Sequence, residues 1–62
     1  MTNVLHECVN NETNMRAYVV ANSKAGKFNV VLQDLDSGAV VPVCHIMPSL
    51  EAAILKAAQV LK

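Results

Sequence analysis

The clearest alternation of hydrophobic and polar residues in the chain runs from Lys27 to Asp34. Every second residue in this segment is apolar: Phe28, Val30 and Leu32. Because successive side chains of a strand point to opposite faces of a sheet, the pattern predicts a half-buried β-strand over residues 27–34.

Two further segments predict strands on either side of this one. Met15–Ala21 is rich in the β-branched and aromatic residues that favour strands, and residues 39–46 form another valine-rich run. Asn22–Gly26 supplies a glycine for positive φ, and Leu35–Gly38 supplies Asp and Ser side chains that hydrogen-bond to nearby backbone in turns. Pro42 cannot donate a ladder hydrogen bond, so we expect the third of these strands at a sheet edge.

The last residues of the chain have the periodicity of an amphipathic helix. Ser49 is a suitable N-cap, and Glu51 follows in the first turn, where the helix dipole favours an anion. The apolar residues that share one arc of the helical wheel are Leu50, Ala53, Ile54, Ala57, Val60 and Leu61. We therefore predict a helix over residues 49–62 that packs on one face of the sheet, with Leu55 among the polar residues on its outer side.

Residues 1–14 do not give a single prediction. Four apolar residues would share one face of a short helix, yet the same segment could equally form an added strand: Val4, Leu5, Cys8 and Val9. Residues 10–14 are polar and predict a loop. The predicted fold class is therefore α+β, with a three-stranded antiparallel meander over residues 15–46, one C-terminal helix packed on one face, and an N-terminal arm of undecided structure. Residues 1–62 form one small domain.

The size and the apolar content of the chain favour self-association. A core built from 62 residues, of which 53% are hydrophobic, stabilises a monomer only marginally. The first and third predicted strands are apolar on both faces, so one helix cannot cover them. We therefore expect an isologous homodimer that uses the uncovered sheet face, an edge strand or the outer side of the helix. The residues expected at these contacts are Val31, Val40, Pro42, Cys44 and Leu55.

The charge balance does not favour a general nucleic-acid binder. The chain has 5 basic and 5 acidic residues, whereas such proteins usually have a basic excess because phosphate neutralisation supplies most of their affinity. A local basic cluster remains around the first predicted turn. It defines an alternative hypothesis, a nucleic-acid-binding domain that uses the basic hairpin and a sheet face, with contacts from Arg16, Tyr18, Lys24 and Lys27.

The two cysteines and two histidines of the chain are the residue types that form a Cys2His2 zinc site: His6, Cys8, Cys44 and His45. Structural zinc sites use closely spaced Cys-Cys and His-His pairs, and neither spacing occurs here. Adjacent residues of a strand point to opposite faces, so Cys44 and His45 are not expected to act as a nucleophile and its base. The segment Asp34–Gly38 lacks the glycine and glutamate positions of a calcium-binding loop. We expect no metal, no cofactor and no catalytic residue.

The N-terminal residues lack the basic and apolar regions of a signal peptide. No apolar run approaches the roughly 20 residues that a membrane span needs. The 2 cysteines would form at most one disulfide. We therefore expect a cytoplasmic protein with reduced thiols and no membrane partner.

Residues 16–62 resemble the N-terminal domain of HicB-type antitoxins. The resemblance rests on Gly26-Lys-Phe28 at the hairpin, Asp34-Leu35 near the next turn, and Ser49-Leu-Glu-Ala-Ala53 at the helix start. The third strand is longer than in that family, and the family's C-terminal DNA-binding segment has no counterpart in this sequence. The resemblance implies a toxin-binding or protein-binding module without operator recognition of its own.

The composition and the resemblance together favour one function over two others. The favoured function is a small non-enzymatic, homodimeric interaction module that binds or inhibits another protein, either antitoxin-like or a regulatory protein of a phage or mobile element. The nucleic-acid-binding domain is the alternative. A structural protein that associates only with itself is the third hypothesis.

Overall fold

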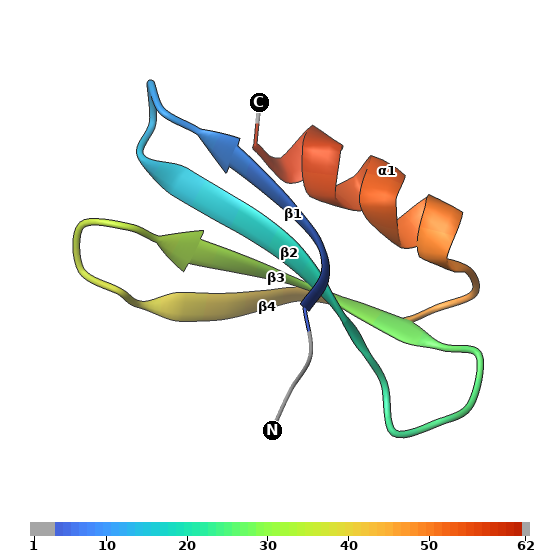
Figure 1. Ribbon diagram of the computed structural model, residues 1–62. Coiled ribbons are helices and arrows are strands. Elements are labelled where there is room, and N and C mark those ends of the chain that lie inside the picture. Colours follow the sequence, from blue (N-terminus) through green and yellow to red (C-terminus); the bar gives the residue numbers. More distant parts are fainter. Residues whose placement is uncertain (1–3, 62) are drawn as a thin grey trace.

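The computed structural model describes residues 4–61, without the side chain of His45. Within this range the chain forms four strands and then one helix (Figure 1). The strands form one antiparallel sheet in which each pairs with its neighbour in sequence, in the order β1-β2-β3-β4. The elements are β1 (Val4–Asn10), β2 (Met15–Ala21), β3 (Phe28–Asp34), β4 (Val40–Met47) and α1 (Leu50–Val60). This confirms the predicted α+β class, an antiparallel sheet followed by a C-terminal helix.

The N-terminal arm, whose structure the sequence left undecided, forms the edge strand β1, so the sheet has four strands instead of the predicted three. β1 pairs with β2 and places Cys8 opposite Ala17. In the turn between the two strands, Asn14 has a φ of 56°, and the Asn10 Oδ1 accepts a hydrogen bond of 3.0 Å from the Glu12 backbone N–H. Asparagine tolerates this left-handed conformation better than most residues. β2 is consequently an inner strand of the sheet and not an outer one.

The other two turns also form where the sequence predicts them. Gly26 and Gly38 have φ values of 74° and 78°, in the left-handed region that favours glycine. The Asp34 Oδ1 accepts a hydrogen bond of 2.9 Å from the Asp36 backbone N–H, as expected for a turn-forming aspartate. These turns fix the register of β2, β3 and β4.

β4 lies at the other edge of the sheet, as its proline predicts. Pro42 lies opposite Val31, but Cys44 lies opposite Val30, so β4 advances two residues where β3 advances one. A second irregularity follows further along the strand, where Ile46 has a φ of 57°. Such bulges bend and twist an edge strand.

The helix begins at the predicted cap and lies across one face of the sheet (Figure 1). The Ser49 Oγ accepts a hydrogen bond of 3.1 Å from the Ala52 backbone N–H, and Glu51 lies in the first turn. At the other end, the Asn10 Nδ2 donates a hydrogen bond of 2.8 Å to the Leu61 backbone carbonyl. This hydrogen bond ties the first hairpin to the end of α1. The last residue of the predicted helix, number 62, lies outside the described residues.

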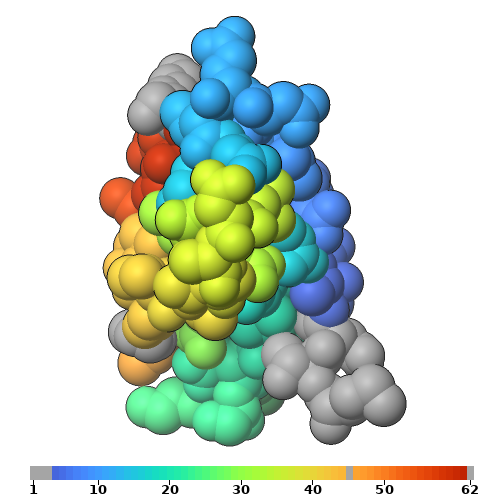
Figure 2. All heavy atoms as spheres, turned by 90° about the vertical axis from the view of Figure 1, so that its left-hand side faces the viewer, coloured from blue at the N-terminus to red at the C-terminus, as the bar shows by residue number. Residues whose placement is uncertain are grey.

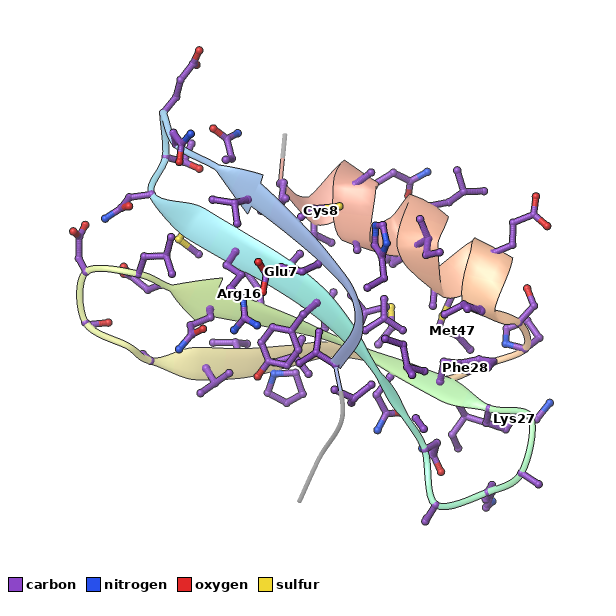
Figure 3. The ribbon with its side chains drawn as sticks, viewed as in Figure 1. Glu7, Cys8, Arg16, Lys27, Phe28 and Met47 are labelled. Carbon is purple, nitrogen blue, oxygen red and sulfur yellow. The ribbon has the colours of Figure 1, made fainter. Side chains whose placement is uncertain are left out.

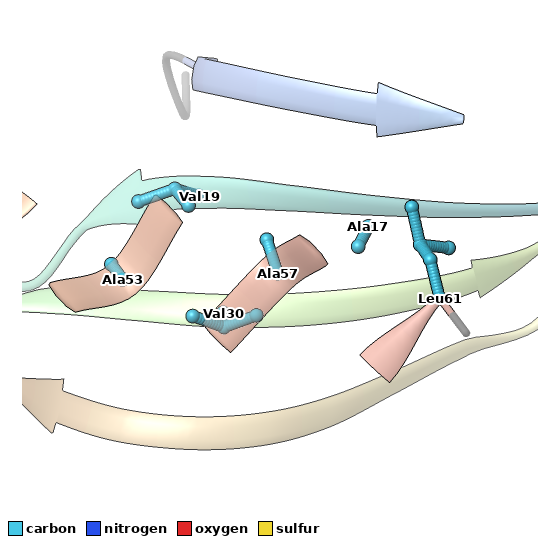
Figure 4. Close-up of a cluster of buried hydrophobic side chains, with 6 residues drawn as sticks. All are labelled: Ala17, Val19, Val30, Ala53, Ala57 and Leu61. Carbon is cyan, nitrogen blue, oxygen red and sulfur yellow. The ribbon is translucent and has the colours of Figure 1, made fainter. Parts of the chain in front are cut away.

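The core lies between α1 and the two inner strands (Figure 4). Its buried side chains come from β2, β3 and the helix, and they are Ala17, Val19, Val30, Ala53, Ala57 and Leu61. Three of the six are alanines, so the helix backbone lies close to the sheet. Figure 2 views the molecule toward the β3–β4 turn and shows the helix, in orange and red, gathered on one side. The result is a thin, two-layer domain with a small core.

Candidate protein-interaction surface

The sheet face opposite α1 is not covered by another helix or strand within residues 4–61. The strand register places its side chains in three rows that cross the sheet, because directly opposite residues share a face. We call these residues the open sheet face. Its rows are Val9–Arg16–Gln33–Val40, Glu7–Tyr18–Val31–Pro42 and Val4–Val20–Asn29.

A polar network lies at the centre of the open sheet face. The Arg16 Nε donates a hydrogen bond of 2.7 Å to the Glu7 Oε2, and its Nη2 lies 2.6 Å from the same oxygen. The Arg16 Nη1 donates a hydrogen bond of 2.9 Å to the Gln33 Oε1. The Arg16 Cζ also lies over the Tyr18 ring, 4.4 Å from its centroid. Three strands therefore fix the guanidinium in one position (Figure 3).

A shallow hollow of about 380 Å³ lies beside this network. Its lining is formed by Val4, Arg16, Tyr18, Val20 and Val31, so one cation borders an otherwise apolar or aromatic depression. Val20 is only 7% exposed, whereas Val4 is 45% exposed. The hollow thus has a buried floor and an accessible wall, and an apolar side chain of a partner could fill it.

Exposed apolar side chains are concentrated on the two edge strands. Isolated exposed apolar residues are ordinary on protein surfaces, but neighbouring ones mark interaction sites more often. Here they are Val4, Leu5 and Val9 on β1, and Val40, Val41 and Ile46 on β4. Val4, Val9 and Val40 belong to the open sheet face, whereas Val41 lies opposite Leu32 on the helix side of the sheet.

The structure brings together three of the five residues expected at an association surface. Val31, Val40 and Pro42 all lie on the open sheet face. Cys44 lies opposite Val30 and packs against the core on the helix side of the sheet. Leu55 is 61% exposed on α1, which covers the other side of the sheet. The two last residues therefore cannot belong to the same surface as the first three.

The four residues proposed to contact nucleic acid do not form one positive surface. Arg16 and Tyr18 lie on the open sheet face, where Glu7 pairs with the guanidinium. Lys24 and Lys27 belong to the β2–β3 turn. Figure 3 shows Lys27 at that end of the sheet, away from Arg16 and Glu7. The cluster expected from the sequence is thus divided into a neutralised arginine and two separate lysines.

The cysteines and histidines considered for zinc are also distributed over the sheet. Both cysteines are free thiols, Cys8 on β1 and Cys44 on β4, and these strands are opposite edges of the sheet. Among the described side chains of residues 4–61, which exclude that of His45, no three or more His, Cys, Asp or Glu residues lie together in a way that could hold a metal ion. One pair does form, because the His6 Nε2 lies 3.2 Å from the Cys8 Sγ. The pair could not be predicted from the sequence, because residues two apart share a face in a strand but not in a helix, and the arm fitted both.

Comparison of the chain with protein-family models, curated proteins and solved structures found no match. The resemblance to HicB-type antitoxins therefore stays an expectation from the sequence. Among the described residues, no helix has both the length and the apolar character needed to cross a membrane.

Proposed function

We propose that this chain is a small non-enzymatic interaction module that forms a homodimer through the open sheet face. In this form it binds or inhibits another protein. The observation that supports the proposal most is the apolar hollow on a sheet face that no element within residues 4–61 covers. A second copy of the chain is the occupant that best fits this face.

The charges of the open sheet face are complementary to themselves. Glu7 and Arg16 are adjacent, and their side chains are 47% and 24% exposed, so both remain accessible to another molecule. A two-fold axis between them would place Arg16 of one copy against Glu7 of the other, as an isologous interface requires. Like charges would not face each other in this arrangement, and the apolar residues of the same face, such as Val31 and Pro42, would be buried in the same contact.

The shape and the central residues of the face suit a dimer interface. The Cα atoms span 33 × 23 × 15 Å, so the molecule is flat and presents a broad side to a partner. Tyrosine and arginine, the residue types that most often dominate binding energy, occupy the centre of this face as Tyr18 and Arg16.

The outer edge of β4 is a weaker candidate for association, although the sequence also indicated this strand. The Asp34 backbone N–H donates to the Ala39 carbonyl across the turn. Along an antiparallel pair, every second residue of a strand directs its backbone N toward the partner strand. The backbone N of residues 40 and 42 therefore points away from β3. Residue 42 is a proline and has no N–H to offer there. Proline and bulges are devices that block pairing at sheet edges. The open sheet face is therefore preferred over this edge.

The proposal that the dimer binds another protein rests on the resemblance to HicB-type antitoxins. That resemblance favours a toxin-like partner and a cytoplasmic location. The nucleic-acid alternative receives less support, because the Arg16 guanidinium is already bound by Glu7 and Gln33.

The experiment that tests the proposal is sedimentation equilibrium over a range of protein concentrations. The wild-type chain is expected to dimerise, and Val31→Lys, which places a charge on the open sheet face, is expected to be monomeric. Leu55→Glu is the matched control on the outer side of α1 and is expected to dimerise like the wild type. A monomeric wild type, or dissociation caused by Leu55→Glu and not by Val31→Lys, would refute the proposed interface. Circular dichroism spectra of both variants check that the fold is intact.

A further inference from the structure

The helix side of the edge strand β1 holds a thiol in contact with an imidazole. His6 and Cys8 lie opposite Val19 and Ala17, two core residues, so both side chains lie on the helix side of the sheet. The His6 Nε2 and the Cys8 Sγ are 3.2 Å apart. Both side chains are half-buried, so they lie at the rim of the core and remain accessible to a small molecule. Figure 3 shows Cys8 beside α1.

An imidazole beside a thiol can act as a base toward it. The thiolate, and not the thiol, is the nucleophile, so a neighbouring base that accepts the thiol proton raises reactivity. We propose that Cys8 is a modification site that forms mixed disulfides with low-molecular-weight disulfides, and that His6 is its proton acceptor. The proposal is independent of the homodimer, because this pair lies on the other side of the sheet from the open sheet face.

The reaction is a thiol–disulfide exchange with one small-molecule disulfide as the oxidant. The Cys8 Sγ attacks one sulfur of the reagent, the reagent's S–S bond breaks, and a new S–S bond to Cys8 forms. The thiol proton passes to the His6 Nε2 and from there to the departing thiolate or, where that thiolate is a weak base, to water. Cys8 is oxidised, the reagent is reduced, and each protein molecule reacts once. Excess thiol reverses the modification.

Cys44 provides a control within the same molecule. It is also half-buried, also lies on an edge strand, and also packs against the core on the helix side of the sheet. Among the described side chains, none forms a hydrogen bond with the Cys44 Sγ. The side chain of His45 is not among those described. Both thiols are thus half-buried against the core, and Cys8 has a described histidine contact.

The test uses an aromatic disulfide reagent that releases a coloured thiolate, with the 62-residue chain carrying one cysteine at a time. The Cys44→Ser protein reports on Cys8, and the Cys8→Ser protein reports on Cys44. Near neutral pH, the folded Cys8 is expected to react about tenfold faster than the folded Cys44. The two rates are expected to become similar in denaturant, where the His6 contact is lost.

The role of His6 is tested by His6→Gln in the Cys44→Ser protein. Glutamine retains hydrogen-bonding groups but cannot accept the proton, so the Cys8 rate is expected to fall toward that of Cys44 and its dependence on pH is expected to change. A structural role alone would leave the pH dependence unaltered. Mass spectrometry of the wild type after treatment with oxidised glutathione, which needs no variant, is expected to place the first adduct on Cys8. Equal rates for the two folded cysteines, a rate unaffected by His6→Gln, or a first adduct on Cys44 would each overturn the proposal.

Discussion

The Arg16 guanidinium extends diagonally from β2 to the Glu7 carboxylate on β1, with 2.6 Å between the Arg16 Nη2 and the Glu7 Oε2. This ion pair joins a strand that the sequence predicts to one that it leaves undecided. It also lies at the centre of the sheet face that no described element covers. Exposed ion pairs typically contribute only about 0.2–1 kcal/mol to stability. The pair is thus expected to contribute little to the stability of the fold.

The first prediction concerns Asn10, which links the first hairpin to the end of the helix. Its Nδ2 donates to the Leu61 carbonyl and its Oδ1 accepts from the Glu12 N–H. Asn10→Ala removes both hydrogen bonds, so we expect the free energy of unfolding to fall by about 1–2 kcal/mol. Urea unfolding measures this change.

Asn10→Asp is the matched variant, because it retains the acceptor but loses the donor. It also places a negative charge at the negative end of the helix dipole, so we expect a loss at least as large as that of Asn10→Ala. If Asn10→Asp were as stable as the wild type, the bond to Leu61 would have no energetic role.

The second prediction concerns the backbone at Ile46. A β-branched residue at a φ of 57° is strained, typically by about 1–2 kcal/mol, and Ile46 is 46% exposed, so little burial compensates for the strain. Asparagine adopts this conformation more readily. We therefore expect Ile46→Asn to raise the free energy of unfolding by about 1 kcal/mol.

Val41→Asn is the control for that substitution, because Val41 is 58% exposed on the same strand and has no positive φ. It is expected to leave stability unchanged or to lower it, since asparagine is a poor strand former. Equal losses in both variants, measured by urea unfolding, would show that Ile46 is not strained.

The positions of β3 and α1 could be predicted from the sequence, whereas that of β1 could not. β3 and α1 have regular apolar periods of two and of about 3.6 residues, so their positions follow from the pattern alone. β1 has no such regular apolar period, because its helix-side positions include the polar His6 and Asn10. A register shift between Val4 and His6 also interrupts the alternation. Its apolar residues therefore fit a helix as well as they fit a strand.

The same undecided strand limited what could be inferred about function. Arg16 was expected to contact nucleic acid under the alternative hypothesis, but its partner Glu7 lies on β1 and could not be placed beside it. Likewise, the contact between His6 and Cys8 follows from their alternate positions on that strand. Val31 and Pro42, on strands that the sequence did predict, were expected at an association surface and lie on the open sheet face.

The third prediction separates the proposed function from the nucleic-acid alternative. Because Glu7 and Gln33 engage Arg16, we expect no shift of labelled single-stranded or duplex nucleic acid at low salt. An electrophoretic mobility assay measures this. Binding that weakens steeply with added salt and is lost in Lys24→Ala or Lys27→Ala would favour the alternative instead.

The most direct test of the proposed homodimer exchanges the charges of its central ion pair. In Glu7→Arg the open sheet face has two central cations, and in Arg16→Glu it has two central anions. Each variant alone would therefore place like charges against each other across the two-fold axis. Mixed together, they would present opposite charges at both contacts.

The measurement is sedimentation equilibrium of each variant alone and of their equimolar mixture, with circular dichroism to check folding. We expect each variant alone to be mainly monomeric and the mixture to form a heterodimer with an affinity close to that of the wild-type homodimer. Wild-type dimerisation that persists unchanged in both single variants would contradict the account. So would a mixture that remains as monomeric as its components.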